Sequence, residues 1–138
     1  QAMDMAAENQ RLELKALEAI HCQKTGALIR AAVISGAICG NAGEDDQARL
    51  GAFADQIGLA FQVTDDVLDV TASSERLGKT AGKDNAAHKA TYVSLLGLEG
   101  AEAESKRLLQ QALSHLEPYG ERADALRALA SQLVIRGS

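Results

Sequence analysis

The chain has 138 residues and carries 14 Lys and Arg against 19 Asp and Glu, which gives a formal net charge of -5 at pH 7. This length allows one domain with a hydrophobic core, and the acidity argues against nucleic acid or an anionic membrane as a partner, because both need concentrated positive charge. A phosphate group would have to be bound by a few well-placed cations or by a metal ion.

The cysteines indicate a reducing compartment. Cys22 and Cys39 fall within one predicted helix, where a rise of about 1.5 Å per residue sets them roughly 25 Å apart. A disulfide needs less than about 7 Å, so we expect free thiols and a cytosolic protein. The longest apolar stretch, residues 26–40, contains Arg30 and is shorter than the ~20 residues of a membrane span, so we expect no spanning segment. The chain begins with Gln1 and not with Met, which we interpret as a fragment or a processed chain.

Helix-forming residues dominate the sequence. It contains a single proline and 3% aromatic residues, and no segment shows the β-branched alternation that is typical of a strand. The fold class that we expect is therefore all-α. The predicted helices lie, in chain order, at about residues 12–39, 46–71, 89–116 and 122–135.

Glycine and proline mark the connections between these helices. The second half of the first helix is rich in Ala and Gly, so we expect it to be buried against another helix, and residues 40–43 end it. A long loop is predicted over residues 71–88. We expect an interruption of the third helix at Gly97 or Gly100, and a break at residues 118–120 before the last helix.

The most informative pattern lies in the second predicted helix. When residues 55–70 are placed at about 100° per residue, the charged and amide side chains fall in one arc of roughly a third of the circumference. This arc, which we call the acidic stripe, contains Asp55, Gly58, Gln62, Asp65, Asp66 and Asp69. Apolar residues and Thr64 fill the other sides of the helix.

Two explanations of the acidic stripe are open. A solvated face is the usual reason for a cluster of charges. Against it, the arc is narrow, no Lys or Arg between Asp55 and Asp69 offers an i,i+4 partner, and Asp is a poor residue for a helix interior. Carboxylates inside a bundle need a counter-charge, and Mg²⁺ is a cation that takes one or two carboxylates together with substrate phosphates. We therefore favour a metal site.

Four lysines are candidates for binding an anion beside such a metal. Lys24 precedes the small-residue part of the first helix, so we expect its ammonium group to point into the interior. Lys79 and Lys83 lie in the predicted loop after the acidic helix, and Lys89 opens the third helical region. An acidic helix followed by a Gly/Lys loop is typical of a metal–diphosphate site, since the metal and the lysines neutralise the same anion.

Other common sites find no support in the sequence. The three histidines have no Cys or second His at the spacing of zinc ligands. The segment Gly78-Lys79-Thr80 lacks the upstream glycine and strand of a nucleotide-binding loop. No Ser/His/Asp arrangement stands out.

Five motifs follow one another along the chain, and each has its counterpart in a known family. They are Gln1 with Asp4, then KTGAL at residues 24–28, FQVTDDVLD at 61–69, GKTAGKD at 78–84 and KATY at 89–92. In their order and spacing the chain resembles the C-terminal half of the trans-prenyl diphosphate synthases of the farnesyl/geranylgeranyl type. The segment 65–69 resembles the second aspartate-rich motif of that family.

The resemblance implies a fold and a reaction. The fold would be the C-terminal portion of the isoprenoid synthase fold, an antiparallel helical bundle. The reaction would be the Mg²⁺-dependent condensation of an allylic diphosphate with isopentenyl diphosphate to a longer prenyl diphosphate, with the farnesyl type favoured. The family also implies a homodimer.

The resemblance also implies a role for individual residues. Asp65 would be a direct Mg²⁺ ligand, Asp69 would act more through water or as a further ligand, and Asp66 would support them. Two groups of side chains would contact the substrate. The diphosphate would be bound by Lys24 and Lys79, with Lys89 as a weaker match. The cationic tail would be faced by Gln62 and Thr25.

Part of the family pattern is absent from these residues. The first aspartate-rich motif, the basic residues that hold isopentenyl diphosphate and the residues that set product length lie, in the family, upstream of the position of Gln1. Two alternatives therefore remain open, a class I terpene cyclase and a non-catalytic subunit of a heteromeric synthase. We expect the 138 residues alone to be inactive, with a missing N-terminal half that supplies the opposing aspartates.

Overall fold

The computed structural model of the chain describes residues 25–77 and 91–135. Within these residues the elements are α3 (Ala27–Cys39), α4 (Glu44–Leu77), α5 (Tyr92–Ser114), the 3-10 helix η2 (Glu117–Ala123) and α6 (Asp124–Val134). The described part of the chain contains no strand, which confirms the all-α prediction.

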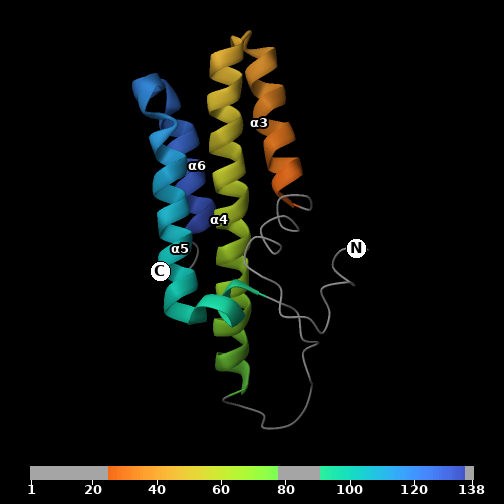
Figure 1. Cartoon of the computed structure of the whole chain (residues 1–138), viewed down its shortest axis with the longest axis vertical. Coiled ribbons are helices and arrows are strands. Elements are labelled where there is room, and N and C mark those ends of the chain that lie inside the picture. The colour runs from red at the N-terminus through yellow and green to blue at the C-terminus, as the bar shows by residue number, and fades with distance from the viewer. Residues whose placement is uncertain (1–24, 78–90, 136–138) are drawn as a thin grey trace.

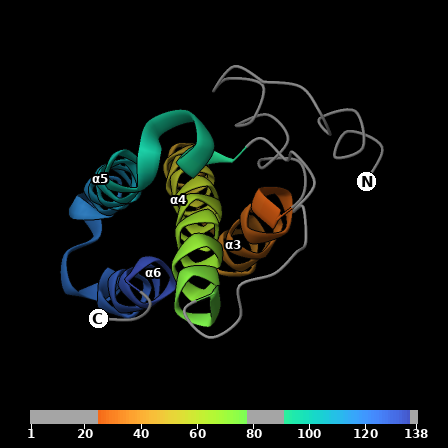
Figure 2. The same ribbon diagram turned by 90° about the horizontal axis from the view of Figure 1, so that it is seen from below.

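The long helix α4 is the centre of the arrangement (Figure 1). Helix α3 runs antiparallel to it on one side, and α5 and α6 form an antiparallel pair on the other (Figures 1 and 2). The predicted antiparallel bundle is confirmed for the described elements. Among these residues, no helix is both long and apolar enough to cross a membrane.

A tight turn joins α3 to α4. Asn41 has a φ of 56°, a conformation that Asn tolerates better than most residues, and it reverses the chain. The amide of Ala42 then donates to the carbonyl oxygen of Ala37 at 2.9 Å, which satisfies an acceptor at the end of α3. The first turn of α4 contains three acidic residues, 44–46, which are favoured at the positive end of the helix.

Helix α4 is longer than the sequence predicts. The expected loop was to begin at Thr71, but the helix continues to Leu77. Inside the helix, the Thr71 hydroxyl donates to the carbonyl oxygens of Val67 and Leu68, each at 3.1 Å, so the threonine bonds within the helix and does not end it. The remainder of the predicted loop, residues 78–88, lies outside the described residues.

Helix α5 begins with a capping box. The Thr91 hydroxyl accepts from the amide of Ser94 at 3.1 Å, and the Ser94 hydroxyl accepts from the amide of Thr91 at 2.9 Å. The helix is interrupted at Gly97, which has a φ of 75° and a ψ of 168°. This positive φ suits a glycine, and it confirms the predicted interruption.

The break before the last helix is also confirmed. Residues 117–123 form the 3-10 helix η2, with Pro118 in its first turn and Gly120 at a φ of 54°. Helix α6 then returns along α5 (Figure 1).

The hydrophobic core lies between α4, α5 and α6. Its members come from all three helices and from two residues between α5 and α6, Leu116 and Ala123. The largest fully buried side chains are Tyr92, Ile57, Leu108, Leu116 and Val63. Burial of these side chains fixes both the distance and the rotation of α4 relative to α5.

Helix α3 is less buried than the sequence predicts. Only Ala37 is fully buried in it, while Leu28 is 72% exposed and Ile38 is 56% exposed. The expectation of a buried small-residue half is wrong for this chain taken by itself, because α3 packs against α4 and its other side meets no described element. The part of the first predicted helix before residue 25 lies outside the described residues.

Candidate metal and diphosphate site

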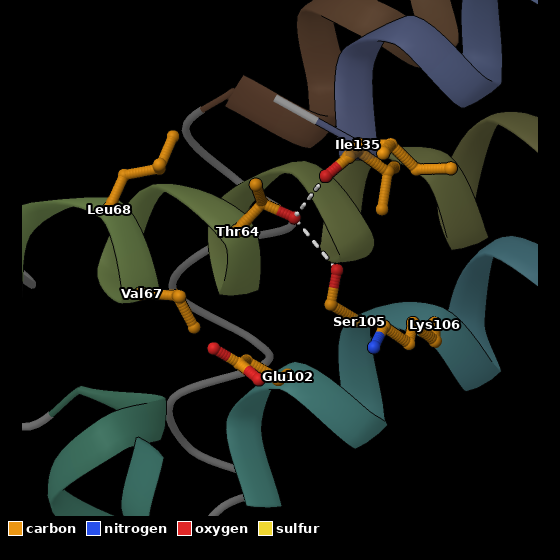
Figure 3. A pocket seen from close by; sticks show the side chains of 8 residues that line it. Thr64, Val67, Leu68, Glu102, Ser105, Lys106 and Ile135 are labelled. Atoms are coloured by element: carbon orange, nitrogen blue, oxygen red, sulfur yellow. Dashed lines mark hydrogen bonds between the residues drawn. The ribbon is translucent and has the colours of Figure 1, made fainter. Parts of the chain in front are cut away.

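The rotation of α4 is set by a buried polar contact on the side away from the acidic stripe. The Thr64 hydroxyl lies 2.7 Å from the Ser105 hydroxyl of α5 and donates to the carbonyl oxygen of Val134 of α6 at 3.3 Å (Figure 3). Because the single hydroxyl proton of Thr64 is donated to Val134, Ser105 is the donor in the hydrogen bond between the two hydroxyls. Thr64 and Ser105 are both buried. This contact joins three helices and turns Asp65, the next residue, away from α6.

A cavity of about 230 Å³ lies on this same side. Thr64, Val67 and Leu68 of α4 line it together with residues of α5 and the end of α6 (Figure 3). On the helical wheel Thr64 and Val67 lie opposite the acidic stripe, and Leu68 lies about 60° outside its edge. The cavity is therefore separate from the candidate site.

Two glycines bring the start of α3 onto the acidic stripe. A Cβ atom placed on Gly58 would lie 2.9 Å from the Cα atom of Gly26, so only glycine permits this approach. Both glycines are buried. Thr25 is bonded directly to Gly26 and is half-buried, and Gln62 of the stripe follows Gly58 by about one helical turn.

Asp55 has a cationic partner that the sequence analysis missed. Arg30 of α3 forms an ion pair with Asp55, with 2.5 Å between Nη1 and Oδ2, and the two side chains are 47% and 52% exposed. An i,i+4 pattern reveals only partners on the same helix, whereas this partner comes from a neighbouring one. The signal in the sequence was Arg30 itself, the single charge in an otherwise apolar stretch.

Asp66 also contacts a neighbouring element. Its Oδ2 atom accepts a hydrogen bond of 2.8 Å from the backbone amide of Tyr92, the first residue of α5. Asp66 is half-buried, and Tyr92 is completely buried. No sequence pattern could reveal this contact, because the donor is a backbone group.

The remaining stripe residues differ in exposure. Gln62 and Asp65 are half-buried, and Asp69 is exposed. Within residues 25–77 and 91–135, no three His, Cys, Asp or Glu side chains are grouped closely enough to hold a metal by themselves. The donors nevertheless fit Mg²⁺, because their carboxylate oxygens are hard ligands and Mg²⁺ usually takes one or two carboxylates while phosphate and water complete its shell.

The candidate cationic residues belong to the parts of the chain beyond the described segments. Lys24, Lys79, Lys83 and Lys89 all lie outside the described residues. The described segments meet the stripe at two places near their ends: Gly26 lies beside Gly58, and the amide of Tyr92 donates to Asp66.

Comparison with known sequences agrees with this arrangement. A sequence model of the polyprenyl synthetase family matches residues 1–130. Farnesyl diphosphate synthase of Escherichia coli (strain K12) is 45% identical over 140 residues, which cover 99% of this chain and 47% of the relative. Dimethylallyltranstransferase of Fischerella ambigua is 44% identical over 137 residues, which cover 99% of this chain and 40% of the relative. The chain thus spans less than half the length of these relatives.

Solved structures show the same relationship. An FPP/GFPP synthase from Zymomonas mobilis matches with a TM-score of 0.81 at 38% identity, covering 97% of this chain and 44% of that one. Geranyltransferase from Helicobacter pylori, solved in complex with magnesium and isoprenyl diphosphate, matches with a TM-score of 0.72 at 35% identity, with the same coverage of 97% and 44%. The family match spans well over half of the chain, and the chain belongs to the polyprenyl synthetase family.

Proposed function

We propose that this chain is the C-terminal half of a Mg²⁺-dependent prenyltransferase that condenses an allylic diphosphate with isopentenyl diphosphate. The observation that carries the proposal is the close approach of Gly26 to Gly58, where an added Cβ atom on Gly58 would lie 2.9 Å from the Cα atom of Gly26. It brings Gly26 of the KTGAL motif onto the same face of α4 as the DDVLD motif. Two motifs that lie about forty residues apart in the sequence therefore approach one face of α4, which supports a shared metal–diphosphate site.

The aspartates of α4 would hold the metal. Asp65 is half-buried on the stripe and would be a direct ligand, Asp69 is exposed and would act through water, and Asp66 would support them. Bound Mg²⁺ would neutralise the diphosphate oxygens and so stabilise the leaving group. The carboxylates themselves fix where the diphosphate can lie, because its negative oxygens are repelled from the stripe wherever no cation intervenes.

The remaining motif residues would bind the substrate. Lys24 and Lys79, with Lys89 as a weaker candidate, would donate to the diphosphate oxygens of the allylic substrate. Gln62 and the oxygen atoms of Thr25 would face its hydrocarbon end, where their negative dipoles stabilise a developing carbocation.

The reaction would proceed by ionisation and addition. The bond between the allylic C1 atom and its oxygen breaks, and both electrons leave with the diphosphate. The double bond of isopentenyl diphosphate then attacks C1, and loss of a proton from the adduct forms the new double bond. The farnesyl product type is favoured.

The rest of the enzyme would come from residues outside this chain. We propose an N-terminal half that covers the outer side of α3, where Leu28 and Ile38 are exposed, and that supplies a second set of aspartates and the isopentenyl diphosphate site. The complete protein would be a homodimer. Its location in the cytosol stays a prediction.

A product assay tests the function. The full-length protein is incubated with Mg²⁺ and geranyl diphosphate, with and without isopentenyl diphosphate, and the products are identified by mass. The proposal predicts elongation only when isopentenyl diphosphate is present. Consumption of geranyl diphosphate alone would indicate a cyclase, and no turnover with either mixture would indicate a non-catalytic subunit; both results would reject the proposal.

A further inference from the structure

Asp66 lies next to Asp65 in the sequence but has a different environment. Its Oδ2 atom accepts from the amide of Tyr92 at 2.8 Å, so this carboxylate is directed at the first turn of α5. The two aspartates are separated by about 100° around α4, so they lie at opposite edges of the acidic stripe and can face different neighbours.

The group that Asp66 binds is held in place from two sides. The side chain of Tyr92 is 0% exposed and belongs to the core between α4 and α5. The preceding residue, Thr91, is locked by its reciprocal hydrogen bonds with Ser94 at 3.1 and 2.9 Å. The amide of Tyr92 therefore points in a defined direction, and its hydrogen bond to Asp66 is a further link between the start of α5 and α4.

This amide also needs an acceptor from outside its own helix. Tyr92 is the first residue of α5, and the first amides of a helix have no intrahelical partner. The Thr91 hydroxyl accepts the hydrogen bond from the amide of Ser94, and Asp66 accepts the one from the amide of Tyr92. A carboxylate is the favoured acceptor at this point, because the amino end of a helix carries partial positive charge.

We propose that Asp66 is a positioning residue and that its role is to accept the hydrogen bond from Tyr92. The bond ties the start of α5 to α4 beside Asp65 and fixes the distance between them. The effect of Asp66 on catalysis, which rests on the proposed function, would then depend mainly on an oxygen atom at this position and much less on its negative charge. Its amide analogue, Asn, keeps that oxygen and loses the charge.

Two variants of the full-length protein separate these roles, and a third controls for the charge. Asp66→Asn keeps the acceptor, Asp66→Ala removes it, and Asp45→Asn removes one exposed carboxylate from the far end of the same helix. Exchange of the Tyr92 amide is followed by NMR, and kcat and KM are measured with geranyl and isopentenyl diphosphates. The exchange measurement needs no substrate, so it tests the contact even if the proposed function is wrong.

We expect Asp66→Ala to speed exchange of the Tyr92 amide by about tenfold or more and to lower kcat by about 100-fold, because the start of α5 is no longer tied to α4. Asp66→Asn should keep the slow exchange and should stay within about tenfold of the original kcat, as should Asp45→Asn. If Asp66→Ala does not fold, the Tyr92 exchange rate and the kcat of Asp66→Asn, each compared with the unchanged protein, test the proposal.

Two results would overturn the inference. Unchanged exchange of the Tyr92 amide in Asp66→Ala would show that the hydrogen bond is not formed. A protected Tyr92 amide in Asp66→Asn together with a loss of kcat as large as that of Asp66→Ala would show that the charge, and hence a metal-ligand role, is what the reaction needs.

Discussion

At the scale of single residues, the aspartates of the stripe share one face of α4 but differ in what they contact. Asp55 pairs with Arg30, Asp66 accepts from Tyr92, and Asp69 is exposed. Identical side chains on one helix face therefore have different partners, because different elements cross that face at different heights.

The contact between Gly58 and Gly26 is the tightest approach on the stripe. Gly58→Ala would place a Cβ atom 2.9 Å from the Cα atom of Gly26, so α3 would have to shift. We expect a loss of about 1–2 kcal/mol in the free energy of unfolding, since the strain exceeds the gain in helix propensity. Denaturant unfolding of the full-length protein measures it.

Gly36→Ala is the matched control for this change. Gly36 is a helical glycine of α3, and a Cβ atom there would meet nothing within 4 Å among the described residues. Its free energy of unfolding should be unchanged or higher. Equal losses in the two variants would contradict the close approach of α3 to α4.

At the scale of elements, α4 is held by contacts on two sides. Thr64 joins it to α5 and α6, while Gly58 lets α3 cross it. Each contact constrains a different property. The Thr64 contact constrains the rotation of α4, and the Gly58 contact constrains the height at which α3 meets the stripe.

Removing the Thr64 hydroxyl should loosen the first constraint. Thr64→Val keeps the shape but leaves the Ser105 hydroxyl and the Val134 carbonyl without this partner in a buried place. We expect a loss of about 1–3 kcal/mol in the free energy of unfolding. Ser114→Ala is the control, since Ser114 is exposed and bonds only within its own helix. No difference between these variants would contradict the buried contact.

One ion pair makes the stability of α5 depend on pH. Hydrogen bonds from Arg107, at 2.7 and 2.5 Å, hold the pKa of Glu104 below its ordinary value of 4.5, and partial burial opposes this shift. A lowered pKa in the folded state means that the pair stabilises the protein above pH 4.5 and that this contribution is lost as the pH falls through the folded-state pKa. The pair should contribute about 0.5 kcal/mol or less, since Arg107 is half-exposed.

Urea unfolding between pH 3 and 7 tests this pair. Glu104→Gln should remove part of the decline in stability below about pH 4.5, because the amide does not titrate. Glu99→Gln, an exposed residue of the same helix, is the control. A decline that is as steep in Glu104→Gln as in the unchanged protein would contradict the assignment.

The sequence predicts the secondary-structure elements better than the tertiary contacts of their side chains. Helices α4, α5 and α6 are predicted because helix-forming residues dominate and no segment alternates like a strand. The breaks at Gly97 or Gly100 and at residues 118–120 are predicted because glycine and proline interrupt helices. The end of α4 was predicted wrongly because residues 71–74 fit a turn equally well. The partners of Asp55 and Asp66 depend on tertiary contacts, which helical periodicity does not specify.

At the scale of the whole molecule, the chain resembles one part of a larger bundle. One side of α3 meets no described element, and the chain spans less than half the length of its relatives. An unopposed acidic stripe would bind Mg²⁺ only weakly, because one or two carboxylates leave most of the metal shell to water.

We therefore expect residues 1–138 alone to be helical but inactive. Circular dichroism should show helix, and an assay with isopentenyl and geranyl diphosphates should show no sustained turnover. The full-length protein at the same concentration is the positive control. Sustained turnover by residues 1–138 would contradict the need for an opposing half.

The most direct test of the central claim compares Asp65→Ala with Asp55→Ala in the full-length protein. Both changes remove one carboxylate from the same face of α4, but Asp55 is paired with Arg30 at the surface, and Asp65 is the proposed metal ligand. The steady-state rate of prenyl elongation should fall by at least about a thousandfold in Asp65→Ala, with the fold intact, and should change less than about threefold in Asp55→Ala. A near-normal rate in Asp65→Ala would contradict the assignment of the acidic stripe as the metal site.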